Sequence, residues 1–219
     1  MENYPSHCVL SPFYTPVYFI IFAMSITTTT KKDKTMKKFT IPTRDEVAPA
    51  NQVIFDNLNK ALGFVPNLYA AIAYSDNGLS RYLAYQNAKT TLSNREKEAV
   101  NLVVSQVNGC IYCQSAHTVI GKMNGFTDEQ LLDIRRGAAT DSRLNALVQL
   151  AESIAKNKGR ADAALVDIFF AEGYTNENLV DLILQVSDKV AMNYLHNLIQ
   201  IPVDFPLAPS LEMDLAGSN

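Results

Sequence analysis

The chain has 219 residues, a formal net charge of -3 at pH 7 and three cysteines. This length accommodates one compact domain with a short extension, and a hydrophobic fraction of 47% supplies its core without disulfide support. The near-neutral charge gives no sign of a nucleic-acid-binding surface. We expect a cytoplasmic protein, because so few cysteines fit a reducing compartment, where a close pair of them is a candidate for chemistry.

Residues 1–35 differ in composition from the rest of the chain. An apolar run at residues 17–24 is shorter than the about 20 residues that cross a bilayer. Basic residues follow this run, whereas they precede the apolar core of a secretory signal. We expect residues 1–35 to be a non-native or disordered leader without stable membrane insertion, and Met36 to be the natural start; a weak membrane anchor is the alternative.

Residues 36–206 are expected to form one helical domain, followed by an irregular tail at residues 207–219. Apolar residues recur at helical spacing, and strand-like alternation is scarce. The first predicted helix ends at Gly63, the second begins at Pro66, and the third is capped by Asp76. The inner face of the first helix is predicted to carry Val53, Ile54, Asn57, Leu58 and Ala61.

The capping box Ser93-x-x-Glu96 predicts a fourth helix that begins at Asn94, and Asn108-Gly109 ends it. Valines give this stretch some strand character, but the capping box and the length favour a helix. The predicted fold class is therefore an all-α, compact helical bundle. Further helices are expected from Cys110 to Gly125, from Thr127 to Gly137, from Asp141 to Gly159, over 162–172 and over 176–200.

One constellation carries the chemistry of the chain. Cys110 and Cys113 are three residues apart at the start of a predicted helix, a spacing that brings their sulfur atoms within reach of a disulfide. The free N–H groups and the positive end of the helix favour a thiolate. His117 follows one turn after Cys113 on the same face and can accept a proton from a thiol.

Glu98 is expected to reach His117 from the preceding helix. Glu98 precedes Gly109 by eleven residues, about 16 Å of helix, and His117 follows Gly109 by eight residues, about 12 Å. If the chain reverses at Gly109, the two side chains lie at similar heights, and a carboxylate beside the imidazole keeps the ring basic. The sequence therefore predicts a proton relay from Glu98 through His117 to a cysteine thiol.

Other interpretations of the cysteines stay open beside the redox pair. Both could be small buried core residues, and His196 could join Cys110, Cys113 and His117 in a zinc site. We favour redox chemistry, with no metal or other cofactor. Three residues are candidates for a pocket, and the tyrosine hydroxyl among them could donate to a peroxide oxygen: Tyr112, His196 and Asn193.

In this motif the chain resembles the alkylhydroperoxidase D-like group of the carboxymuconolactone decarboxylase superfamily. The resemblance covers about residues 40–206, and residues 193–206 are similar to the ending of the "peroxidase-related" members. The family pattern is Glu, eleven residues, Cys-x-x-Cys, three residues and His, which this chain matches with Glu98, Cys110, Cys113 and His117.

The resemblance implies an all-helical oligomer with active sites near subunit interfaces, and thiol peroxidase activity towards hydroperoxides. Cys113 then attacks the peroxide and becomes a sulfenic acid, while Cys110, nearer the helix start and more exposed, resolves it to a disulfide. Glu98 and His117 relay the proton. A dithiol of the lipoyl type, or a thioredoxin-like protein, reduces the disulfide.

One departure from the family pattern bears on this expectation. Alkylhydroperoxidase D itself carries a histidine between the cysteines, where this chain has Tyr112, so one possible member of the proton relay is absent. Two alternatives stand beside the peroxidase. One is an enzyme of the decarboxylase type, which has no need of a cysteine pair, and the other is a non-catalytic, redox-sensing helical oligomer.

Overall fold

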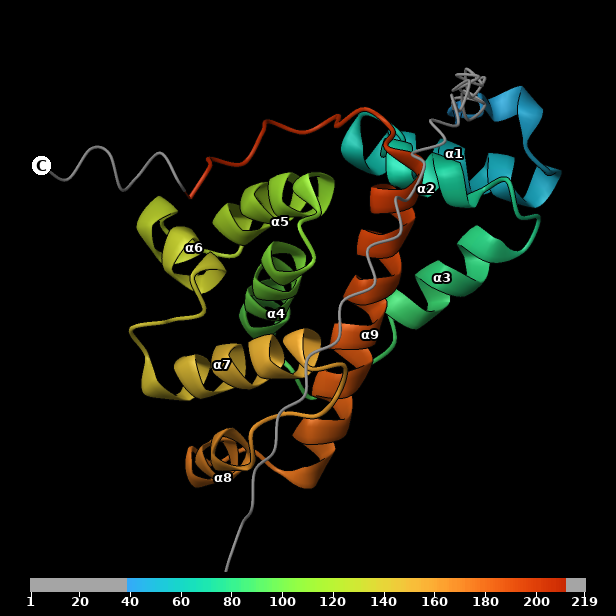
Figure 1. The fold of residues 1–219 in the computed structure, drawn as a ribbon. Coiled ribbons are helices and arrows are strands. Elements are labelled where there is room, and N and C mark those ends of the chain that lie inside the picture. The colour runs from blue at the N-terminus through green and yellow to red at the C-terminus, as the bar shows by residue number, and fades with distance from the viewer. Residues whose placement is uncertain (1–38, 212–219) are drawn as a thin grey trace, which may run out of the picture. The chain divides into compact units, whose positions relative to one another are not determined.

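A computed structural model describes residues 39–211, and every regular element in this range is helical (Figure 1). The all-α fold class is confirmed, while the predicted leader at residues 1–35 lies outside the described residues. No helix between residues 39 and 211 has both the length and the apolar character needed to cross a bilayer. In chain order the elements are the 3₁₀ turn η1 (Arg44–Glu46) and the α-helices α1 (Pro49–Leu62), α2 (Asn67–Ile72), α3 (Gly78–Gln86), α4 (Asn94–Val107), α5 (Ile111–Met123), α6 (Asp128–Arg135), α7 (Ser142–Lys156), α8 (Ala163–Ala171) and α9 (Asn176–Ile199).

Local capping chemistry sets the helix ends around the motif. The Glu96 carboxylate accepts a hydrogen bond from the Ser93 backbone N–H at 2.8 Å, and the Ser93 hydroxyl accepts one from the Glu96 N–H, so the predicted capping box begins α4. Gly109 has a φ of 64°, the left-handed conformation that glycine adopts without strain. This residue reverses the chain between α4 and α5, as the sequence predicts.

Two details of the first three helices were predicted wrongly. α1 buries Asn51 and Phe55, whereas Val53 on the predicted inner face is 59% exposed. Asn51 turns inward because its amide donates to the Ala73 carbonyl at 2.9 Å, which the end of α2 leaves without a helical partner. The N-cap of α3 is the residue after Asp76, and no side chain caps this helix.

α4 lies at the centre of the main helical layer and contacts α5, α6, α7 and α9 (Figure 1). Its valines at 100, 103 and 104 are fully buried against α7 and α9, with Leu147, Leu150 and Leu182 among their neighbours. This burial around most of the helix stabilises it despite the strand propensity of valine.

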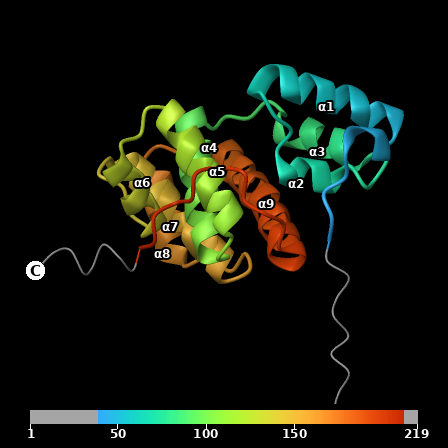
Figure 2. The ribbon, with the colours of Figure 1, turned by 90° about the horizontal axis from the view of Figure 1, so that it is seen from above.

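A second group of helices, α1, α2 and α3, lies beside this layer and has its own apolar cluster (Figure 2). The segment after α9 runs back past α5 towards α6 (Figure 1), where Arg135 donates to the Pro209 carbonyl at 2.6 Å. The same segment holds α2, because the Asp204 carboxylate accepts from the Asn67 backbone N–H at 2.6 Å. A further apolar cluster therefore joins α2, α5, α9 and this segment.

Candidate active site

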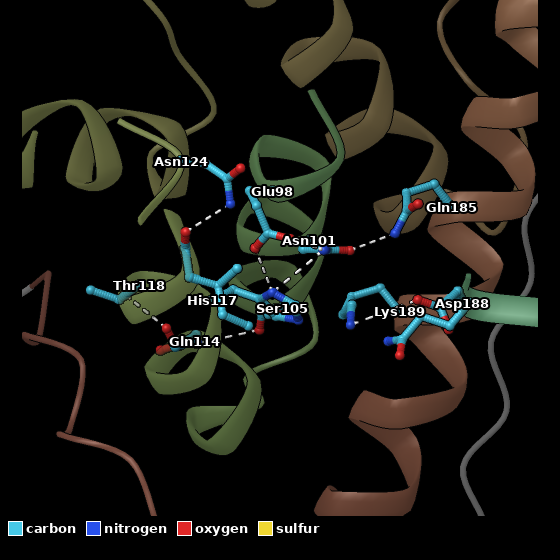
Figure 3. Close-up of polar contacts among 12 residues, drawn as sticks. Glu98, Asn101, Ser105, Gln114, His117, Thr118, Asn124, Gln185, Asp188 and Lys189 are labelled. Carbon is cyan, nitrogen blue, oxygen red and sulfur yellow. Dashed lines mark hydrogen bonds and ion pairs between the residues drawn. The ribbon is translucent and has the colours of Figure 1, made fainter. Parts of the chain in front are cut away.

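The structure brings Glu98 of α4 and His117 of α5 into direct contact (Figure 3). His117 Nδ1 lies 2.7 Å from Glu98 Oε2, and each residue is only 8% exposed. This is the approach that the helix arithmetic predicts. With the Nδ1 hydrogen donated to the carboxylate, Nε2 keeps its lone pair and can accept a proton.

Two amides hold the Glu98 carboxylate in place. Asn101 Nδ2 donates to Glu98 Oε1 at 3.1 Å, and Gln185 of α9 in turn donates to Asn101 Oδ1 at 2.7 Å (Figure 3). Burial opposes ionisation of Glu98, but the charge and hydrogen bond of His117, helped by Lys189, outweigh it and lower the pKa of Glu98. The carboxylate is therefore ionised at neutral pH. Of the residues that surround Glu98, the sequence predicted only His117.

Cys110 and Cys113 are both free thiols at the start of α5. Cys110 is the N-cap of the helix, and its sulfur accepts a hydrogen bond from the Cys113 N–H at 3.3 Å. The expectation that Cys110 is the more exposed cysteine is wrong, since it is 0% exposed and Cys113 is 3% exposed. As an N-cap the side chain folds back over the first turn, where the apolar cluster of α2, α5 and α9 covers it.

The two thiols differ in acidity. The hydrogen bond between the two thiols lowers the pKa of Cys110 to about 5, against the opposing effect of burial, with His196 as a further contribution. The same interaction, together with burial, raises the pKa of Cys113. Such coupled values belong to the pair, so the physical result is a dithiol that loses its first proton readily.

A pocket of about 360 Å³ lies over Cys113 and His117, between the group of α1, α2 and α3 and the helices α5 and α9. Cys113 lines this pocket and Cys110 does not, so Cys113 is the sulfur that a bound molecule meets. Tyr112 forms part of the wall, as expected for a pocket residue. The other walls are mostly apolar and aromatic, from Leu62, Phe64, Leu68, Tyr69, Tyr82, Val119, Ile120, Met123, Met192 and Phe205.

Lys189 of α9 is a site residue that the sequence motif does not contain. It lines the pocket, although its side chain is only 3% exposed. Its ammonium lies 3.8 Å from Asp188 Oδ2 (Figure 3). Burial lowers the pKa of Lys189, but Asp188 and then Cys113 outweigh it, and the net shift is upward. The pocket thus contains a buried positive charge beside the Cys113 sulfur.

The two remaining candidate pocket residues, Asn193 and His196, do not line this pocket. Asn193 is fully buried and donates to the Ser105 hydroxyl at 3.1 Å. His196 packs on the ring of Tyr112, with 5.2 Å between the ring centroids. The Tyr112 hydroxyl accepts from the Leu68 N–H at 3.2 Å, and its own hydrogen is engaged by the Asp204 carboxylate instead of a peroxide oxygen.

The zinc site considered from the sequence is not formed. Between residues 39 and 211, no three histidine, cysteine or acidic side chains gather as metal ligands would. His117 is directed to Glu98 instead, and His196 lies against Tyr112.

Comparison with known proteins gives one family and a set of similar folds. The profile of the carboxymuconolactone decarboxylase family matches residues 74–156. An alkylhydroperoxidase AhpD core, described as an uncharacterized peroxidase-related protein from Ralstonia eutropha JMP134, is 19% identical, with a TM-score of 0.69 over 76% of this chain and 92% of its own. No curated protein shares enough sequence with the chain to count as a relative.

Two further solved structures have similar folds. An uncharacterized peroxidase-related protein from Silicibacter sp. TM1040 is 20% identical, with a TM-score of 0.67 over 79% of this chain and 94% of its own. A cysteine-to-alanine variant of the debrominase Bmp8, in complex with 2,3,4-tribromopyrrole, is 15% identical, with a TM-score of 0.63 over 75% of this chain and 90% of its own.

Proposed function

We propose that the chain is a thiol-dependent peroxidase that reduces hydroperoxides, because residues 74–156 match the carboxymuconolactone decarboxylase family and the fold is alkylhydroperoxidase D-like. The main support for this proposal is that one pocket contains both the free thiol of Cys113 and the imidazole of the Glu98–His117 pair. Decarboxylation of a lactone needs no neighbouring thiol pair, so Cys110 and Cys113 favour the peroxidase over that alternative.

In the first step His117 Nε2 takes the proton of the Cys113 thiol, and the thiolate attacks the outer oxygen of the hydroperoxide. The O–O bond breaks, Cys113 becomes a sulfenic acid, and the leaving alkoxide receives the proton from His117. Lys189 stabilises the negative charge that passes from sulfur to oxygen in this apolar pocket. One thiol and one hydroperoxide thus give one sulfenic acid and one alcohol.

In the second step Cys110 attacks the Cys113 sulfenic acid, which yields the disulfide and water. The N-cap position places Cys110 one turn from Cys113, and its sulfur already accepts the Cys113 N–H at 3.3 Å. A dithiol of the lipoyl type, or a thioredoxin-like protein, then reduces the disulfide. Such reductants are available in the cytoplasm, where we place the protein.

A homo-oligomer forms part of the proposal. Met123 and Leu62 line the pocket and are 80% and 53% exposed, so its entrance is apolar. Val180 and Leu184 are exposed at helical spacing on α9, where they add a second apolar surface. Soluble monomers rarely leave such surfaces uncovered, and a second copy of the chain would bury them. Sedimentation of the purified protein tests this, and a monomer at all concentrations would contradict it.

Thiol oxidation kinetics test the peroxidase. In a Cys8→Ser background, which restricts the thiol signal to the pair, reduced protein is mixed rapidly with an alkyl hydroperoxide. We expect thiol loss at least about a hundredfold faster than for free cysteine, and loss of that advantage in Cys113→Ser. Cys110→Ser should stop at a sulfenic acid that dimedone traps. A redox sensor would oxidise once without turnover when a dithiol is supplied, and thiol loss no faster than for free cysteine would refute the peroxidase.

A second candidate is the reductive dehalogenation of an acidic halogenated aromatic ring. The aromatic pocket with the buried ammonium of Lys189 favours it, since such a ring would stack on tyrosines and pair its negative charge with the lysine. The pair of thiols supplies two electrons, so an aryl bromide and two thiols give the arene, hydrogen bromide and a disulfide. Bromide release from a bromophenol by the reduced protein tests this candidate.

A further inference from the structure

We infer that His196 is the proton acceptor for Cys110, so that each cysteine of the pair has an imidazole of its own. The inference rests on the proposed thiol cycle and assigns a proton acceptor to its second step. His196 lies near the end of α9 and is only 2% exposed. It is outside the substrate pocket and lies against Tyr112 and Ile201, which share an apolar cluster with Cys110.

The hydrogen bonds of His196 determine which nitrogen is free. Nε2 lies 3.1 Å from the carbonyl oxygen of Ile201, which can only accept, so Nε2 carries the hydrogen. Nδ1 of the neutral ring is therefore an acceptor. It is buried and has no hydrogen-bond partner of standard geometry in the described part of the chain. A buried acceptor without a partner is unfavourable, which makes Nδ1 ready to take a proton.

The Cys110 thiol is the group that interacts with this imidazole. Cys110 is fully buried in the first turn of α5. Burial lowers the pKa of His196, but the neighbouring Cys110 outweighs it and raises that pKa, while His196 contributes to lowering the pKa of Cys110. The two shifts have the directions expected of a thiolate beside an imidazolium.

Other titratable groups near His196 do not compete for this role. Tyr112 of α5 stacks on the ring, and burial, followed by Asp204, raises its pKa, so it stays protonated at neutral pH. Asp204, from the segment after α9, accepts the Asn67 N–H and interacts with the Tyr112 hydroxyl. Lys189, two turns earlier on α9, lines the pocket on the Cys113 side.

The arrangement also accounts for the tyrosine between the cysteines. His196 reaches from α9 to the ring of Tyr112, at 5.2 Å between centroids, and supplies an imidazole that the Cys-x-x-Cys segment itself lacks. Once Cys113 is a sulfenic acid, its thiol no longer lowers the pKa of Cys110. Cys110 then gives its proton to His196 Nδ1, and the Cys110 thiolate attacks the sulfur of the sulfenic acid. The S–O bond breaks as the S–S bond forms, and the leaving hydroxide with the proton from His196 gives water.

A titration that needs no peroxide tests the pairing. In a protein with Cys8→Ser and Cys113→Ser, Cys110 is the one thiol, and its ultraviolet thiolate absorbance is followed against pH. We expect His196→Gln, which keeps a donor for the Ile201 carbonyl and loses the basic nitrogen, to raise the midpoint by at least about one pH unit. His7→Gln, the same change outside the described residues, is the matched control and should leave it unchanged.

Single-turnover oxidation with hydroperoxide tests the step itself. His196→Gln should lose its first thiol at the wild-type rate, form the disulfide at least about tenfold more slowly near neutral pH, and accumulate a dimedone-trappable sulfenic acid on Cys113. The rate of disulfide formation should recover as rising pH ionises Cys110 directly. A purely structural defect would slow both steps and would not recover.

A third measurement avoids any change at His196. Imidazole NMR of the wild-type protein should show a lower pKa of His196 in the disulfide form than in the dithiol form, because oxidation removes the Cys110 thiolate. An unchanged Cys110 midpoint in His196→Gln, or, where this variant does not fold, equal His196 titrations in both redox forms, would overturn the inference. A wild-type protein that ignores hydroperoxides but shows these shifts refutes the peroxidase and leaves the pairing intact.

Discussion

The substitution Glu98→Gln tests the proton relay most directly, because it removes a charge and keeps the shape of the side chain. Glu98 Oε2 and His117 Nδ1 are 2.7 Å apart in a buried setting. With charge centres about 4 Å apart and an effective dielectric constant of about 20, the carboxylate and an imidazolium attract each other by about 4 kcal/mol. If about half of this energy is felt during proton transfer, the barrier rises by about 2 kcal/mol and thiol oxidation near neutral pH slows about 30-fold.

Rapid mixing of reduced protein with hydroperoxide, followed by acid quench and thiol titration, measures this rate without tryptophan fluorescence, which the chain cannot supply. Glu177→Gln makes the same change at an exposed position in the first turn of α9 and should react like the wild type. Glu98→Asp keeps the charge at a greater distance from His117 and should give an intermediate rate. A Glu98→Gln protein with an unchanged melting temperature and a rate within about twofold of the wild type would refute the relay.

Three further outcomes are expected. Lys189→Met should slow thiol oxidation about tenfold or more, measured in an Asp188→Asn background so that no unpaired buried carboxylate is left. The pKa of Cys110, lowered to about 5 from 9.0, stabilises the folded dithiol form increasingly as pH rises from about 5 to 9; melting temperatures should show this rise for the reduced protein and not for Cys110→Ser. Gly121→Ala would place a Cβ atom 2.6 Å from Leu131 Cδ2 and should destabilise the fold by about 1–3 kcal/mol in urea unfolding.

The helix boundaries near the motif and the contact between Glu98 and His117 follow from the sequence because their causes are local. A capping box and a left-handed glycine act within a few residues, and the rise per residue then places two side chains at one height. The inner face of α1 was predicted wrongly for the opposite reason. Periodicity counts apolar residues, whereas Asn51 turns inward to satisfy the Ala73 carbonyl, a contact across 22 positions.

The motif also does not predict how exposed the two cysteines are. The Cys-x-x-Cys spacing predicts that both cysteines lie in the first turn of a helix. It does not predict which residues pack over them. Cys110 is sealed by residues that come from α2, α9 and the segment after α9, with Leu68, Met192 and Ile201 in the same cluster. Only the tertiary packing shows that Cys113 faces the pocket and Cys110 faces away from it.

The residues that tune the two thiols come from one stripe of α9. Lys189, Asn193 and His196 recur at the i, i+4 and i+7 spacing of a single helix face, and all three are buried. A polar stripe of this kind on a helix with apolar neighbours is the signal in the sequence that could have identified Lys189. Lys189 and Asn193 interact with Cys113, and His196 interacts with Cys110.

Different helices therefore position the two thiols and adjust their charge. Helices α4 and α5 fix the sulfur atoms and the Glu98–His117 pair through local geometry. The hydrogen bond between the thiols is the main cause of their unequal charge, and residues of α9 add to it. Substitutions at Lys189 and His196 should therefore change the titration of the thiol pair and leave the 2.7 Å contact of Glu98 intact. A chain that kept the Cys-x-x-Cys motif but lost this stripe would keep the spacing of its two thiols and form the disulfide more slowly.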